Sequence, residues 1–94
     1  MTGSNVWGPP LWKFIHAVCN FHFEENNEHH VKHAIECLRA LKGAIPCYKC
    51  QAFYEEKLKE LDSINMTERL ALYNWSVRLH NAVNEKLGKP SWSG

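Results

Sequence analysis

The chain lacks the features that would direct it to nucleic acid, to a membrane or to secretion. Eleven lysines and arginines stand against ten acidic residues, and no stretch interleaves basic and aromatic residues as nucleic-acid-binding surfaces do. No apolar run approaches the roughly 18 residues that a membrane-spanning helix needs. Residues 1–5 lack the basic start and apolar middle of a secretory signal. These absences predict a cytoplasmic protein that binds neither nucleic acid nor membrane.

Cysteine is scarce, with four among 94 residues. A secreted miniprotein held together by disulfides would carry more cysteine and less apolar sequence. Hydrophobic residues make up 45% of the chain, which is enough for one core, and the length suits one domain. We therefore expect a single domain over residues 1–94.

Alternating β patterns longer than a few residues are also missing, whereas apolar residues recur at helical spacing. The pattern predicts four helices, over about 9–19, 28–42, 47–61 and 67–87. Pro9–Pro10 would open the first helix and Thr67 would cap the fourth. Gly43 and Gly88 would end the second and fourth. Short connections favour an all-α, antiparallel four-helix bundle, with residues 91–94 as a short extra turn.

Cys47 and Cys50 form a C-x-x-C pair, which can close a small disulfide or supply half of a zinc site. Pro46 precedes the pair and a helix-forming run follows it, so both cysteines should lie in the first turn of a helix. Free N–H groups and the helix dipole stabilise a thiolate there. Neither the strand of a thioredoxin motif nor the histidine of a c-type haem motif accompanies the pair. Redox chemistry is the favoured interpretation, with a metal site and inert thiols as alternatives.

Two further groups of residues combine aromatic and polar character. Trp12 and His16 lie one turn apart on the first predicted helix. On the last, His80 and Asn84 share a face with Leu87, and Trp75 lies upstream. Each group alone is commonly core or a solvated helix end, but polar groups on an apolar helix need partners. A pocket for a polar, aromatic ligand is the alternative.

Together, in this order and spacing, the three motifs resemble the Erv/ALR family of FAD-linked sulfhydryl oxidases, most closely its short virus-encoded members. The resemblance covers about residues 7–92. It rests on Trp7-Gly8-Pro9-x-x-Trp12-x-x-x-His16, Pro46-Cys47-x-x-Cys50 and Trp75-x-x-x-x-His80-Asn81-x-Val83-Asn84-x-x-Leu87-Gly88-Lys89-Pro90.

The resemblance implies a homodimeric helical bundle, usually with a short fifth helix, holding FAD at one end. Electrons would pass from a substrate dithiol to the C-x-x-C pair, to FAD and to oxygen, giving hydrogen peroxide. Cys50 would be the catalytic thiol next to the flavin, and the helix start would favour its thiolate. Cys47 would be the catalytic thiol that exchanges with the substrate. By family position, the residues around FAD would be Trp7, Gly8, Trp12, His16, Trp75, His80, Asn81, Val83, Asn84, Leu87 and Lys89, with Lys86 and Trp92 as weaker matches.

The chain departs from many family members because it has no cysteine before Trp7 and none after Leu87. Such members carry a second, shuttle disulfide in a terminal extension. We therefore expect the pair to meet a thiol-containing protein directly, for example a thioredoxin-like carrier. The likeness to viral members implies a setting at virus assembly or in the virion.

We expect no functional role for the remaining thiols and histidines. In a hairpin of the first two helices, Cys19 and Cys37 would be offset by roughly 7 Å, which is awkward for a disulfide. We expect two buried free thiols. His29, His30 and His33 suggest a solvated face and no metal site. Two competing functions remain, a redox-inert helical interaction module and a bundle stabilised by zinc on Cys47 and Cys50.

Overall fold

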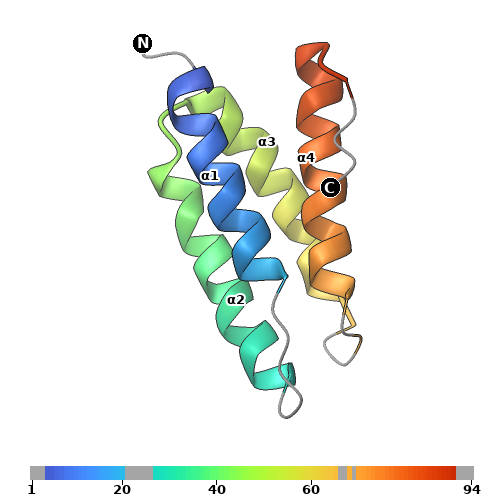
Figure 1. Cartoon of the computed structure of the whole chain (residues 1–94). Coiled ribbons are helices and arrows are strands. Elements are labelled where there is room, and N and C mark those ends of the chain that lie inside the picture. The colour runs from blue at the N-terminus through green and yellow to red at the C-terminus, as the bar shows by residue number, and fades with distance from the viewer. Residues whose placement is uncertain (1–3, 21–26, 66–67, 69, 91–94) are drawn as a thin grey trace.

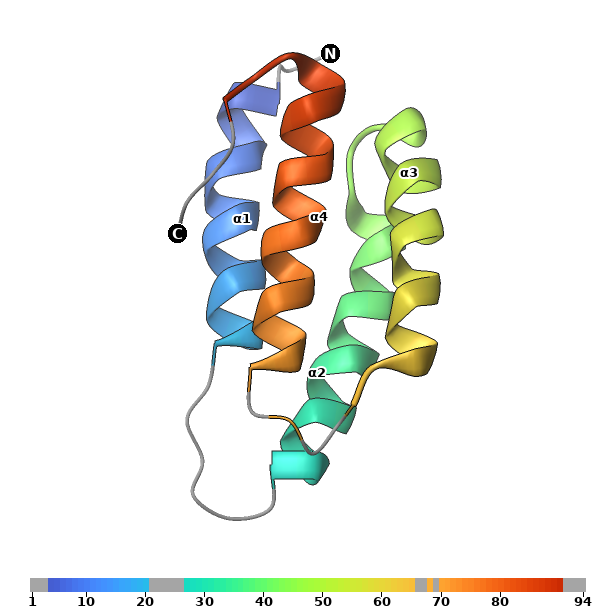
Figure 2. The same cartoon turned by 90° about the vertical axis from the view of Figure 1, so that its right-hand side faces the viewer.

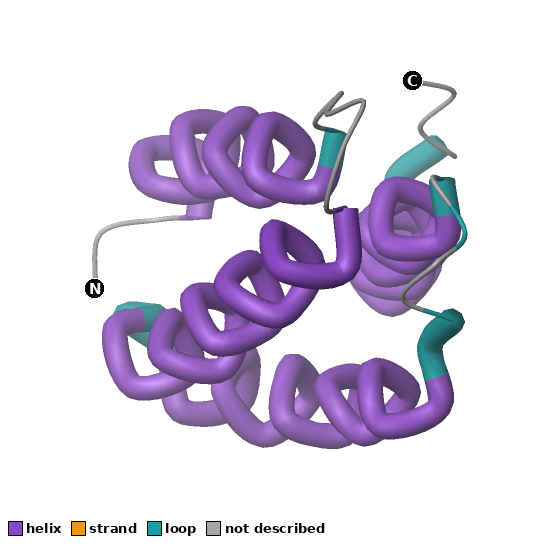
Figure 3. Tube along the Cα trace, turned by 90° about the horizontal axis from the view of Figure 1, so that it is seen from below, coloured by secondary structure: helices purple, strands orange, loops and turns teal. Residues whose placement is uncertain are grey.

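The chain folds as an antiparallel bundle of four helices (Figure 1). The computed structural model describes residues 4–20, 27–65, 68 and 70–90. The helices are α1 (Ser4–Cys19), α2 (Asn27–Leu41), α3 (Tyr48–Leu58) and α4 (Ala71–Leu87), and short 3-10 turns, η1 (Lys42–Ala44) and η2 (Lys59–Ser63), follow α2 and α3. No strand occurs in these ranges (Figure 3), which confirms the all-α prediction. Within the same ranges, no helix has the length and apolarity to cross a membrane.

The helices run alternately along one axis, so that distant segments meet at the ends of the bundle. Figure 2 shows α1 beside α4 and α2 beside α3. In both side views the beginning of α1, the beginning of α3 and the end of α4 lie at the same end of the molecule (Figures 1 and 2). This end therefore carries the C-x-x-C pair at the start of α3. The beginning of the N-terminal motif and the end of the C-terminal motif lie at the same end.

The core is formed by the apolar stripes that the helical periodicity predicts. Ile15 of α1, Leu38 of α2 and Leu79 of α4 are each at most 2% exposed, and they belong to one continuous cluster. Complete burial of a leucine or isoleucine side chain contributes about 1.5–3 kcal/mol. These stripes hold the four helices together.

Two polar side chains link neighbouring helices inside this core. The Tyr54 hydroxyl of α3 donates to the Leu38 carbonyl of α2. The Trp75 indole N–H of α4 donates to the Lys57 carbonyl of α3 at 3.2 Å. Both aromatic residues are almost fully buried, at 4% and 1% exposure, so each needs the hydrogen bond that it makes.

The predicted start of the first helix was wrong, because α1 begins at Ser4 and contains Pro9 and Pro10. A proline in a helix lacks the N–H that would bond the carbonyl four residues earlier. Here those carbonyls belong to residues 5 and 6 in the first turn, where Val6 is 60% exposed. Because water can satisfy a carbonyl at such a position, the helix tolerates both prolines.

Of the two glycines predicted to end helices, one does so and the other does not. Gly43 does not end α2 in the left-handed conformation, since it lies inside η1 and only Gly88 has a positive φ among the described residues. Gly88 closes α4 as predicted, with φ 72°, and the following Lys89 N–H donates to the Asn84 carbonyl at 2.7 Å. Helix α4 begins at Ala71. The proposed cap Thr67 and the proposed extra turn at residues 91–94 lie outside the described residues.

Candidate functional site

The C-x-x-C pair sits at the beginning of α3, with the two cysteines in different positions. Cys47 precedes the helix as its N-cap, with extended backbone (φ −167°, ψ 114°), and its Sγ accepts the Cys50 N–H at 3.3 Å. A sulfur thus occupies the place that serine or aspartate usually takes at a helix start. Cys50 lies within the first turn and packs against the core cluster. Only Cys50, therefore, is in the helix proper.

This geometry separates the acidities of the two thiols. The hydrogen bonds from the Cys50 side chain and backbone N–H lower the pKa of Cys47, and the Lys49 backbone N–H and ammonium lower it further. Burial, followed by the neighbouring Cys47, raises the pKa of Cys50 to about 11. The helix start therefore stabilises a thiolate at Cys47. A backbone hydrogen bond at the helix start also lowers the pKa of Cys50, as expected, but burial and the neighbouring Cys47 outweigh it.

Lys86 of α4 reaches across to the same cysteine pair. Its ammonium lies 4.6 Å from the centroid of the Phe53 ring, one turn beyond Cys50 on α3. Its positive charge lowers the pKa of the Cys50 thiol, against the larger effects that raise it. The C-terminal end of α4 is thereby within electrostatic reach of the redox pair.

Trp12, His16 and His80 form a stacked cluster between α1 and α4. The Trp12 and His80 rings lie nearly parallel, with centroids 4.0 Å apart and 11° between planes. His16 Nε2 lies 2.9 Å from His80 Nδ1. Its Nδ1 lies 3.0 Å from Ser76 Oγ. Since 4.0 Å is ordinary contact between stacked rings, no third ring fits between Trp12 and His80 in this arrangement.

Burial keeps the imidazoles of this cluster neutral. It lowers the pKa of His16. It also lowers the pKa of His80 to about 4, with smaller contributions from the positive charges of His16 and Lys89. Near neutral pH both rings therefore present one N–H and one lone pair.

One buried polar group in the first turn of α1 lacks a partner within the described residues. The Trp7 indole nitrogen is buried without a hydrogen bond. Asn84 of α4 is a second polar residue with little exposure, at 8%. A Cβ added at Gly8 would meet no heavy atom within 4 Å, so the chain's own packing does not require glycine there. Buried polar groups of native proteins are nearly always paired, and this set suits a bound polar ligand.

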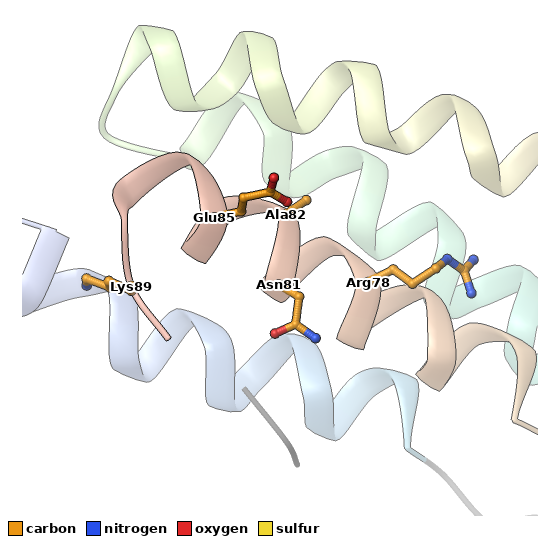
Figure 4. A pocket seen from close by; sticks show the side chains of 5 residues that line it. All are labelled: Arg78, Asn81, Ala82, Glu85 and Lys89. Atoms are coloured by element: carbon orange, nitrogen blue, oxygen red, sulfur yellow. The ribbon is translucent and has the colours of Figure 1, made fainter. Parts of the chain in front are cut away.

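Asn81 of α4 and Lys89 of the turn after it line a pocket of about 440 Å³. The lining residues come from α4 and the turn after it (Figure 4), namely Arg78, Asn81, Ala82, Glu85 and Lys89. A single helix and the turn after it supply the whole lining, so the pocket is an open hollow on the surface. The Asn81 amide and the Lys89 ammonium could contact a ligand that extends over this surface.

The other predicted cofactor residues occupy distinct surroundings. Val83 packs against the core cluster, whereas Leu87 is 55% exposed. Trp75 is 1% exposed and bonded to Lys57, so its ring belongs to the contact of α4 with α3 and not to the Trp12–His80 cluster.

Cys19 and Cys37 are both free thiols in the structure. Cys19 is 1% exposed, as expected, whereas Cys37 is only partly buried. Burial raises the pKa of Cys19 to about 12. His29 and His33 are exposed, with ring centroids 4.6 Å apart. Among the described residues, no group of three or more histidines, cysteines and carboxylates lies close enough together to hold a metal ion.

Sequence reasoning missed Ser76, which connects His16 to α4, and gave Lys86 little weight. Serine inside a helix carries no signal of its own. Its position four residues before His80 places it on the same face as that ring, which could have identified it. For Lys86 the signal was its separation of three residues from Val83 and of seven from Leu79, both of which lie on the core side of α4.

The fold and the site define a helical bundle that carries a redox-type cysteine pair at one end and an aromatic, histidine-rich cluster between the middle parts of α1 and α4. A sequence model of the Erv1 / Alr family matches residues 9–94. The chain belongs to this family.

Two curated relatives agree with this assignment at modest identity. The FAD-linked sulfhydryl oxidase ERV1 of Oryza sativa subsp. japonica is 25% identical over 83 residues, which cover 88% of this chain and 42% of that protein. A probable FAD-linked sulfhydryl oxidase of Acanthamoeba polyphaga mimivirus is 28% identical over 85 residues, which cover 88% of this chain and 59% of that protein. The chain thus spans about half the length of these relatives.

Proposed function

We propose that the chain is a FAD-dependent thiol oxidase that forms disulfide bonds in protein substrates. The observation that carries the proposal is the combination of three features in one bundle: the Cys47–Cys50 pair at the start of α3, the stacked Trp12–His80 rings halfway along α1 and α4, and the buried indole nitrogen of Trp7, which has no partner among the described residues. The names of the two relatives and the family membership support the same activity.

These residues fit FAD in chemical kind. The cofactor offers two flat ring systems, a ribityl chain with hydroxyls and two phosphates. Trp12 and His80 would present outer ring faces or edges to a flat ring, and Trp7 and Asn84 would supply buried hydrogen-bonding groups. Asn81 and Lys89 are donors suited to phosphate. Bound FAD supplies the two-electron acceptor that the side chains lack.

The cysteine pair can perform the exchange with a substrate. A substrate thiolate attacks Cys47 Sγ of the Cys47–Cys50 disulfide, forms a mixed disulfide and releases the Cys50 thiolate, which Lys86 stabilises. A second substrate thiolate then attacks the substrate sulfur of the mixed disulfide and releases Cys47. The substrate gains a disulfide and gives up two electrons and two protons, while the pair becomes a dithiol. Cys47 suits release because its pKa is lowered, and a thiol of lower pKa leaves faster.

The decisive test is the visible spectrum of the purified protein before and after a dithiol is added without oxygen. We expect a flavin spectrum that bleaches with dithiol and returns with oxygen, with one hydrogen peroxide formed per disulfide. Cys50→Ser should keep the flavin and lose the bleaching, and Cys37→Ser is the matched control that should bleach normally. A folded protein that never takes up FAD would refute the proposal and leave the redox-inert module or the zinc-stabilised bundle.

We also propose that the protein is a homodimer, as the family resemblance implies. Val6, Pro10 and Phe14 lie along one side of α1, and Val6 and Phe14 are 60% and 47% exposed. A second copy covering this side would remove apolar surface from water. Sedimentation should give a dimer for the native chain and a monomer for Phe14→Glu; a native chain that stays monomeric at high concentration would refute the dimer.

A further inference from the structure

Ser76 is the hub of a buried hydrogen-bond network between α1 and α4. It is 0% exposed. Its Oγ lies 2.6 Å from the Tyr73 carbonyl oxygen and 3.0 Å from His16 Nδ1. The same hydroxyl lowers the pKa of the neighbouring Cys19 thiol, against the larger effect of burial that raises it. One side chain thus contacts polar groups of both α1 and α4 in the interior.

Counting protons decides which group donates in each of these bonds. A carbonyl oxygen only accepts, so the single hydroxyl hydrogen of Ser76 goes to Tyr73. The lone pairs of Oγ are then left to accept, and the bond with His16 uses one of them. His16 must therefore carry its proton on Nδ1, which leaves a lone pair on Nε2.

The same reasoning passes on to the second imidazole. His16 Nε2 and His80 Nδ1 are 2.9 Å apart, which is a hydrogen-bond distance. With a lone pair on His16 Nε2, the proton of this bond must belong to His80 Nδ1. We propose that Ser76 is a positioning residue that fixes the tautomers of both histidines, so that His16 and His80 each carry their proton on Nδ1.

The assignment has a chemical consequence for the ligand, which rests on the proposed function. His80 Nε2 presents a lone pair on the ring that stacks on Trp12. A cofactor group that contacts this atom has to donate, as an imide N–H, an exocyclic amine or a ribityl hydroxyl does. A carbonyl or an ionised phosphate oxygen could not bond to this atom, because both atoms would be acceptors.

The groups that face the two imidazoles favour the neutral pair. On α1 these are the neutral Cys19 thiol and the Trp12 ring; on α4 and the turn after it they are the Tyr73 ring and the Lys89 ammonium. None of these described groups is an anion that would stabilise an imidazolium. A proton added to His16 Nε2 would also face the N–H of His80 and force that ring to change tautomer.

The test is a two-bond nitrogen–proton correlation spectrum of histidine in the ¹⁵N-labelled protein as purified, at pH 7. We expect His16 and His80 both to give the Nδ1–H pattern, which is distinct from the more common Nε2–H pattern. Ser76→Ala should abolish the pure Nδ1–H signal of His16, and Ser76→Thr, which keeps the hydroxyl, should restore it. Ser63→Ala is the matched control, because exposed Ser63 makes the same kind of bond to the Glu60 carbonyl far from both histidines.

An Nε2–H pattern for either histidine in the native protein would overturn the proposal, and so would tautomers that do not change in Ser76→Ala. The native spectrum decides the assignment even where a variant folds poorly. A protein with the expected tautomers that fails to take up FAD would refute the proposed function and leave the tautomer assignment intact. A protein that binds FAD with other tautomers would do the reverse.

Discussion

At the scale of single residues, the two cysteines of the pair differ in their surroundings because they occupy different positions at the helix start. Cys47 caps α3 from outside the helix, and Cys50 lies inside its first turn. The hydrogen bonds of the helix start reach Cys47, whereas burial dominates at Cys50. One thiol is thereby prepared for ionisation and the other is kept protonated.

We therefore predict that Cys47 is alkylated before Cys50 in the reduced protein, with a midpoint on the pH axis below that of an ordinary thiol. In Cys47→Ser, the substitution Lys86→Gln should slow alkylation of Cys50 by about two- to fivefold, since a nearby positive charge is lost. Lys57→Gln is the matched control. Lys57 lies over the same Phe53 ring at 5.6 Å, but it does not act on the Cys50 pKa. Equal rates in the two glutamine variants would contradict the role of Lys86.

His80 gives a second prediction, for stability at acid pH. Its pKa is about 4 in the folded protein and about 6.5 in an unfolded chain. Between these values the unfolded state binds more protons, so stability falls as pH drops from about 6.5 to about 4. Since the ring is partly solvent-exposed, we expect a loss of about 1–2 kcal/mol in the free energy of unfolding. Denaturant titrations at pH 7 and pH 4.5 measure it, and His80→Gln should show a smaller loss.

At the scale of elements, one tryptophan hydrogen-bonds to a neighbouring helix and another does not. Trp75 donates from α4 to the Lys57 carbonyl of α3. The Trp7 indole N–H of α1 has no partner among the residues that the structure describes. A hydrogen bond in a buried site is costly to remove on one side, whereas an unpaired donor is costly to keep.

Trp75→Phe should therefore lower the free energy of unfolding by about 1–3 kcal/mol, because it removes this hydrogen bond and part of a fully buried ring. Trp7→Phe, its matched control, should change the stability of the cofactor-free protein by less than about 0.5 kcal/mol. If Trp7 donates to bound FAD, the same variant should release the cofactor more readily. Equilibrium unfolding in urea with and without FAD separates these effects, and equal destabilisation by both substitutions would contradict the structure.

At the scale of the whole molecule, the alternating direction of the helices decides which motifs meet. The start of α1, the start of α3 and the end of α4 share one end because each helix reverses the previous one. The same packing places Cys19 deep inside, where it is 1% exposed. Opening of the bundle is needed before a reagent can reach it.

Alkylation of Cys19 should thus be at least about 1,000-fold slower than that of Cys47 in native buffer, since it depends on the small population of open molecules. Partly exposed Cys37 should react at an intermediate rate. Mass spectrometry of the modified peptides over time measures all three. In denaturant the rates of Cys19 and Cys37 should become similar, and rapid native labelling of Cys19 would contradict the packing.

Much of the fold could be read from the sequence because helices are local. The apolar spacing predicted four helices, and the end of α4 at Gly88 is confirmed by its left-handed backbone. The start of α1 could not be read correctly. Whether Pro9 and Pro10 open a helix or lie inside it depends on solvent access to the carbonyls of the preceding turn, which local sequence does not reveal.

The sequence by itself determined the helices, the cysteine pair and the family, because these depend on residue types at short spacings. Tertiary structure alone decided that Trp75 belongs to the core, that Lys86 reaches the redox pair and that His16 joins Ser76 to His80. The physical reason is the same in each case. Burial and hydrogen bonding between different helices depend on how the helices pack, and helical periodicity fixes only which side of each helix is apolar.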